Sequence, residues 1–178
     1  MRSRSFRYAG RLLMLAAAFI TCVCALSACS GSFGKSSGNS SAYLGEYSYN
    51  SPISAMVYED MGTEGAGIQY RMVTDYDKLI AYSPVPVCLY FYGGLDTDNS
   101  GITADVEQMA ENYHDKILFV SVDAEQNNEL ASHFELEALP DFVLLENGSL
   151  KASFSSFDGK TWAGRDLEEW ILANIDIS

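Results

Sequence analysis

The sequence predicts an α/β domain built on a mixed or parallel central sheet. The first indication is the apolar run Val85–Tyr92, which is rich in Val, Tyr and Phe and lacks polar alternation. Such a run suits a strand covered on both faces. The second indication follows Gly93 and Gly94, where apolar residues recur on one helical face, at Ile102, Val106, Met109, Ala110 and Tyr113. Strand, loop and helix form half of a βαβ unit, and such folds place ligands at the strand's carboxyl end.

The first 28 residues have the outline of a secretory signal peptide. Four arginines form a basic start, residues 12–26 are apolar, and Leu26-Ser27-Ala28-Cys29 closes the segment. This ending is similar to the lipobox of bacterial lipoproteins, in which the cysteine is lipidated and begins the mature chain. A plain signal peptide cut nearby and an uncleaved anchor are the alternatives, although the apolar run is short for a full span. We expect lipidation at Cys29, and with it an extracytoplasmic domain held at the cell membrane or cell envelope.

Removal of this segment makes the chain strongly acidic. Four of the 11 Lys and Arg residues precede Cys29 and all 24 Asp and Glu residues follow it, so the remainder carries a formal charge of −17. This charge argues against binding to nucleic acid or anionic lipid head groups. It is compatible with cationic partners and with divalent cations.

The cysteine count excludes an intramolecular disulfide in the exported chain. Cys22 and Cys24 leave with the signal, Cys29 carries lipid, and Cys88 alone remains. Cys88 lies in the middle of the apolar run, where a cysteine behaves as a small hydrophobic residue.

Two segments precede the main domain. Residues 29–41 are rich in Ser and Gly and read as a flexible tether. Residues 42–65 carry too many Tyr and aliphatic residues for a linker, so we expect this extension to pack against the domain and to add an edge strand around 53–58.

The domain itself is expected to span residues 66–178. Strands are predicted at Ile68–Val73, Val85–Tyr92 and Ile117–Val122, and a hairpin at Phe142–Leu145 and Leu150–Phe154 around the turn signal Asn147-Gly148. Helices are predicted after Thr74 or Asp75, from Ile102, after Asn127 or Asn128, and over Leu167–Ile175. His114 and His133 have neither a nucleophile nor a second ligand nearby in sequence, and we interpret both as surface residues.

Several segments in this order resemble the thioredoxin family. Leu89-Tyr90-Phe91-Tyr92-Gly93-Gly94-Leu95 aligns with the family's strand and turn, and Asp96-Thr97-Asp98-Asn99 aligns with its Cys-Gly-Pro-Cys motif. Val122-Asp123 with Asn128-Glu129-Leu130-Ala131 is similar to its V-D…N-x-x-L-A segment, and Leu139-Pro140 to its cis-proline step. Residues 142–150 resemble its hairpin and residues 167–175 its last helix. The resemblance covers residues 66–177.

This resemblance implies a thioredoxin-like fold, with a central mixed sheet of four to five strands flanked by helices on both faces. The chemistry of the family is missing, because both active-site cysteines are replaced and Tyr90 stands where the family has a buried acid. The expectation is therefore a domain that is not an enzyme.

The loop after the central strand also resembles an EF-hand calcium loop. Asp96, Asp98, Ser100, the carbonyl of Ile102 and Glu107 occupy ligand positions one, three, five, seven and twelve, with Gly101 at the sharp turn. A strand rather than a helix precedes the loop, and Thr103 stands where an aliphatic residue is usual. The alternative is that these Asp, Asn and Ser residues cap the following helix.

Three functions fit these observations. The favoured one is a lipid-tethered module that binds an envelope protein or peptide in the groove between the acidic loop and Leu139-Pro140. A protein related to thiol–disulfide oxidoreductases, using Cys88 or a partner's thiols, is the second. A calcium-binding structural domain, through the Asp96–Glu107 loop, is the third and is compatible with the first. Apart from Ca²⁺ no cofactor is expected, and the fold alone does not decide among the three.

Overall fold

The computed structural model describes residues 41–62, 65–93, 100–155 and 162–177. The predicted signal peptide, Cys29 and almost all of the Ser/Gly-rich tether lie outside these residues. The described residues belong to one compact unit, residues 32–178. Within this part of the chain, no helix combines the length and the apolar character needed to cross a membrane.

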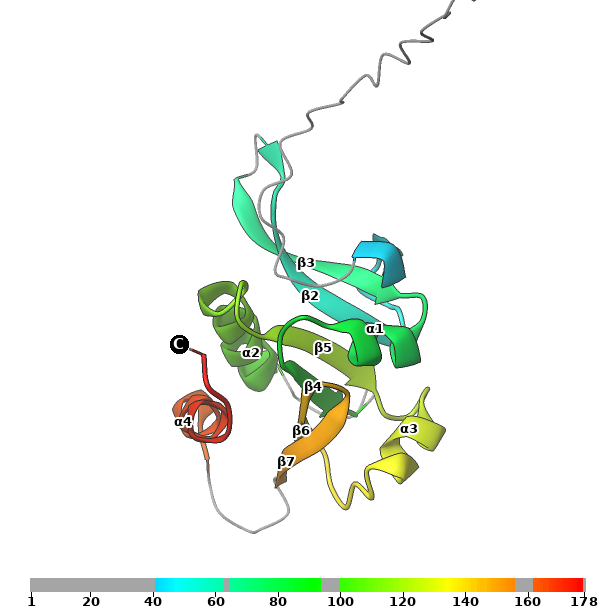
Figure 1. Cartoon of the computed structure of the whole chain (residues 1–178), viewed down its shortest axis with the longest axis vertical. Helices are drawn as coiled ribbons and strands as arrows, with labels where there is room; N and C mark the ends of the chain where they lie inside the picture. Colours follow the sequence, from blue (N-terminus) through cyan, green and yellow to red (C-terminus); the bar gives the residue numbers. More distant parts are fainter. Residues whose placement is uncertain (1–40, 63–64, 94–99, 156–161, 178) are drawn as a thin grey trace, which may run out of the picture. The chain divides into compact units, whose positions relative to one another are not determined.

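A seven-stranded mixed sheet forms the centre of the unit (Figure 1). Its strands lie in the order β1-β3-β2-β5-β4-β6-β7. Their bounds are β1 Leu44–Tyr47, β2 Ile53–Asp60, β3 Ala66–Val73, β4 Val87–Tyr92, β5 Leu118–Asp123, β6 Asp141–Glu146 and β7 Ser149–Ser155. This architecture confirms the predicted α/β, thioredoxin-like class.

The central strands behave as the apolar runs predict. β4 pairs in parallel with β5 and antiparallel with β6, and its residues Val87–Phe91 are all buried. β5 is buried along its whole length. Because both strands are covered on two faces, their sequences show no polar alternation.

The sheet is larger than the predicted four to five strands because the segment before residue 66 is part of it. A strand at residues 53–58 is confirmed by β2, but its expected position at an edge is wrong. β2 lies between β3 and β5, and Ala55, Met56 and Val57 are 0–2% exposed. Three consecutive buried residues require cover on both faces, which an interior strand has. β3 folds back antiparallel onto β2 and lies between β2 and β1, which is the edge strand on this side of the sheet.

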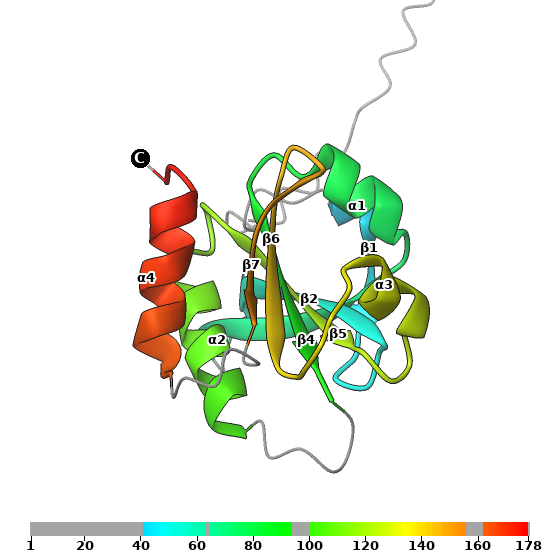
Figure 2. The same ribbon diagram turned by 90° about the horizontal axis from the view of Figure 1, so that it is seen from below.

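Helices cover both faces of the sheet, as Figure 2 shows. α1 (Tyr76–Tyr82) and α3 (Asn128–His133) lie on one face, and α2 (Ser100–Asn112) and α4 (Gly164–Asn174) lie on the other. A short 3₁₀ helix, η1 (Ser41–Tyr43), precedes β1. The buried residues accordingly form two clusters, one per face, separated by the sheet.

Local signals in the sequence set two of the element boundaries. Of the two expected caps for α1, Asp75 is the one used, since its Oδ1 accepts a hydrogen bond from the Lys78 amide at 3.1 Å. The turn between β6 and β7 contains Asn147 and Gly148 with φ of 52° and 76°. Both values are positive, as a type I′ hairpin turn requires.

Candidate functional site

The carboxyl end of β4 is where the sequence predicts the ligand loop. Tyr90, which stands in place of a buried acid, is 1% exposed and stacks on Phe142 with ring centroids 5.2 Å apart. Its hydroxyl lies 3.0 Å from Thr103 Oγ1 in the first turns of α2. Tyr90 therefore connects β4 to α2 through a neutral hydrogen bond.

The predicted calcium ligands are only partly within the described residues. Asp96 and Asp98 lie outside them, and Ser100 is described only as the first residue of α2. Glu107 is described, and its Oε1 accepts a hydrogen bond from the hydroxyl of Tyr70 on β3 at 2.7 Å. No group of three or more His, Cys, Asp or Glu side chains converges within the described ranges.

The step between α3 and β6 has the geometry that the resemblance implies. The Leu139-Pro140 peptide bond is cis, and Asp141 follows it as the first residue of β6. Asp141 is 3% exposed, and its Oδ1 has no hydrogen-bond partner among the described residues. Burial raises the pKa of this carboxyl to about 6, although hydrogen bonds from Ser155 and the Phe142 amide act in the opposite direction.

The thiol of Cys88 is inaccessible. Cys88 is 0% exposed in the middle of β4, and burial raises its pKa to about 12. A nucleophilic cysteine needs a thiolate and an approach path for its substrate. The environment of Cys88 provides neither.

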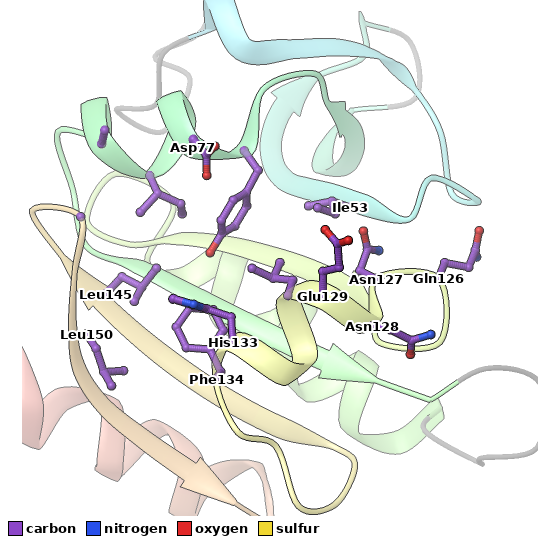
Figure 3. A pocket seen from close by; sticks show the side chains of 15 residues that line it. Ile53, Asp77, Gln126, Asn127, Asn128, Glu129, His133, Phe134, Leu145 and Leu150 are labelled. Carbon is purple, nitrogen blue, oxygen red and sulfur yellow. The ribbon is translucent and has the colours of Figure 1, made fainter.

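A separate pocket of about 770 Å³ lies on the face that carries α1 and α3 (Figure 3). Asp77 reaches it from α1, Glu129 from α3 and Leu145 from β6. Leu139 and Pro140 are not among its lining residues, so it does not coincide with the predicted cis-proline groove. His133, predicted to be a surface residue, is exposed and lines this pocket. His114 is half-buried and its ring lies tilted against that of Tyr58, with ring centroids 4.7 Å apart.

Sequence reasoning missed both the pocket and Asp141. The signal for Asp141 was an acid placed directly before the apolar run 142–145 and after a proline. No periodicity predicts the pocket, because its lining comes from five separate elements and the turns beside them.

A family model and several known proteins match parts of this chain. The family model described as Thioredoxin matches residues 68–172. The chain is 29% identical over 75 residues to chloroplastic thioredoxin Y of Oryza sativa subsp. japonica, which covers 42% of this chain and 45% of that protein. It is 29% identical over 93 residues to monothiol glutaredoxin-4 of Saccharomyces cerevisiae, which covers 52% of this chain and 37% of that protein.

A bacterial relative is matched over more of its length. Thioredoxin 1 of Chlorobaculum tepidum is 26% identical over 80 residues, which cover 45% of this chain and 79% of that protein. The chain spans about half the length, or less, of the plant and yeast relatives described above.

Proposed function

Because the chain belongs to the thioredoxin family, we propose that it is a membrane-tethered, extracytoplasmic member that binds a protein or peptide without dithiol redox activity. The observation that carries this proposal is the state of Cys88, which is fully buried with its pKa raised to about 12. Dithiol exchange needs an attacking thiolate and a second, resolving thiol. The sequence contains no pair of cysteines separated by two residues.

The binding surface we propose is the groove beside Leu139 and Pro140. These residues are half-buried and lead into β6, whose Asp141 lies opposite Phe91 near the carboxyl end of β4. Open α/β sheets present ligand sites at the carboxyl ends of their strands. A peptide bound there requires no chemistry from the loop that replaces the Cys-Gly-Pro-Cys motif.

Photo-crosslinking in membranes tests binding at this groove. The full chain would carry p-benzoylphenylalanine at position 139, with the same residue at Glu46 on the outer strand β1 as control. We expect a light-dependent adduct at position 139 that survives reduction and alkylation of all thiols. Absence of such an adduct contradicts groove binding. An adduct that forms in the dark and disappears on reduction supports thiol exchange instead.

The tether is the second part of the proposal. The lipobox-like Leu26-Ser27-Ala28-Cys29 supports acylation of Cys29, and two chains give durable attachment where one gives only marginal binding. Labelling of the full chain with radioactive palmitate should fail in Cys29→Ala. Equal label on the variant and the parent contradicts lipidation at this residue.

Two alternatives have support of their own. The matched relatives are thioredoxins and a monothiol glutaredoxin, which favours a protein related to thiol–disulfide oxidoreductases that acts through Cys88 or a partner's thiols. The buried state of Cys88 opposes its use there. A calcium-binding structural role rests on the spacing of Asp96, Asp98, Ser100, Ile102 and Glu107.

A further inference from the structure

We propose that the pocket between α1 and α3 is a second binding site, which takes a lysine or arginine side chain and its apolar neighbours from a basic peptide segment of a partner protein. This inference deepens the proposed function by naming the chemistry of a partner, and it rests on the domain acting by binding. The site is defined by its lining residues and lies apart from the cis-proline groove.

The size and floor of the pocket suit a ligand with apolar parts. Its volume of about 770 Å³ lies within the usual range of ligand pockets, roughly 300–1,000 Å³. Ile80 and Leu145 are at most 7% exposed and form part of the floor, together with the half-buried Leu130 and Phe134. Apolar side chains of a peptide would be removed from water against this surface.

The charged residues of the pocket favour a cationic ligand, because the lining holds two carboxylates and no Lys or Arg, and its one basic residue is His133. Asp77 and Glu129 line the pocket, and among the described residues neither carboxylate forms an ion pair. Two other acids, by contrast, form ion pairs: Asp75 pairs with Lys78 at 2.7 Å, and Glu146 pairs with Lys151 at 3.1 Å. Lys78 and Lys151, which are sequence neighbours of the lining residues Asp77 and Leu150, are thus each paired with an acid that does not line the pocket.

The hydroxyl of Tyr76 adds a neutral polar group to the same site. Burial, and to a smaller extent Asp77, raise the pKa of Tyr76, so its hydroxyl stays protonated and able to donate. The whole chain carries a formal charge of −13, which favours encounter with basic partners over acidic ones.

The sheet edge beside the pocket favours a peptide over an isolated organic cation. Leu150 lines the pocket, is 61% exposed and belongs to β7, the last strand of the sheet. An outermost strand offers backbone groups with which an extended peptide can pair. Alternate side chains of such a peptide would point to the face that carries the pocket.

Calorimetric titration of the full chain in neutral detergent tests the site. The probes are three acetylated, amidated hexapeptides of alternating composition: Lys with Leu, Glu with Leu, and Lys with Ser, each titrated also into detergent alone. The variant Asp77→Asn/Glu129→Gln removes both rim carboxylates without changing side-chain size. Glu46→Gln/Glu111→Gln makes the same change in net charge at two exposed residues outside the pocket. Thermal unfolding of both variants verifies that they remain folded.

We expect saturable binding of the Lys/Leu peptide, with a Kd raised about tenfold by the pocket variant and less than about twofold by the control variant. The Glu/Leu and Lys/Ser peptides should bind at least about tenfold more weakly, because the first lacks the cationic side chains and the second lacks the apolar side chains. Equal weakening by the two variants, equal affinity for the Lys/Ser peptide, or absence of saturable binding overturns the proposal.

The titration and the crosslinking experiment distinguish failure of the pocket proposal from failure of the proposed groove binding. If the pocket variant binds normally while crosslinking at position 139 persists, the pocket assignment fails and the groove remains. If crosslinking at position 139 fails while the pocket binds the Lys/Leu peptide as expected, the proposal of groove binding is contradicted and the pocket proposal is supported.

Discussion

At the scale of single residues, the buried acids of the sheet differ in how their oxygens are satisfied. Asp123 at the end of β5 accepts hydrogen bonds from the amides of Glu125 and Gln126 and from the side chain of Gln126. Asp141 has an Oδ1 without a partner among the described residues. Burial of the Asp141 carboxyl disfavours its ionised form and raises its pKa to about 6, against the opposing effect of hydrogen bonds from Ser155 and the Phe142 amide.

This raised pKa predicts a pH-dependent loss of stability. Between about pH 4 and the folded pKa of about 6, the native state holds a proton on Asp141 that the unfolded chain releases. The native state then binds more protons, so the contribution of Asp141 to stability falls as pH rises through this window and is level above it. Compared with the parent, Asp141→Asn should gain about 1–2 kcal/mol in free energy of unfolding between pH 4 and pH 7.

Urea unfolding at a series of pH values measures this difference directly. Glu111→Gln, which removes one exposed carboxyl, is the control for the loss of a charge. Stability curves of the parent and Asp141→Asn that stay parallel from pH 4 to pH 7 would show that Asp141 ionises freely in the folded state.

At the scale of elements, the crossing of α2 and α4 depends on one glycine. Gly164 is the first residue of α4, and a Cβ added there would overlap the carboxylate and the Cβ of Asp105 on α2. The overlap involves the root of the Asp105 side chain and not only its flexible end, so rotation of the carboxylate does not relieve it. We expect Gly164→Ala to lower the free energy of unfolding by about 1–3 kcal/mol.

A second glycine provides the matched control for this prediction. Gly101 lies in the first turn of α2, and a Cβ there would meet no atom within 4 Å. Gly101→Ala should therefore be neutral or stabilising by up to about 1 kcal/mol, through helix propensity alone. Equal destabilisation by the two substitutions in chemical denaturation would contradict the close approach at Gly164.

The start of α2 carries the calcium prediction. If the loop binds calcium with a Kd near 0.1 mM, about 2 mM calcium stabilises the fold by about 1.8 kcal/mol and raises Tm by roughly 4–7 °C. Glu107→Gln should abolish this shift, because it removes the bidentate carboxylate. Tyr70→Phe, which removes only the hydrogen bond to Glu107, should leave the shift in place.

Thermal unfolding in calcium, magnesium and chelator separates this prediction from helix capping. Capping residues respond only to general screening, which magnesium reproduces. Identical melting of the parent in all three solutions would leave Asp96, Asp98 and Ser100 as capping residues and Glu107 as the acceptor for Tyr70.

At the scale of the whole molecule, the order of elements could be predicted from the sequence, while their neighbours in space could not. The runs Val85–Tyr92 and Ile117–Val122 and the Asn147-Gly148 turn carry local signals that the structure follows. The interior place of β2 depends on pairing with β5, more than 60 residues later. The local spacing of apolar residues does not predict which distant strands pair with each other.

In the candidate site, too, the features with a local signal could be predicted from the sequence, and those that depend on tertiary packing could not. The cis peptide bond at Leu139-Pro140 and the buried state of Cys88 agree with what the resemblance and the apolar run imply. The pocket depends on where α1, α3 and the β6–β7 turn come to lie relative to one another. That arrangement is a property of tertiary packing, to which the order of the elements contributes only indirectly.

We propose that this thioredoxin-family domain works by binding and not by dithiol exchange. Turnover of a protein disulfide with dithiothreitol tests it most directly, for the parent full chain, Cys88→Ser and Asp96→Cys/Asn99→Cys. We expect the parent and Cys88→Ser to match the reductant blank, and the variant with two new cysteines to exceed it by at least about tenfold. A parent rate above the blank that disappears in Cys88→Ser would contradict the claim.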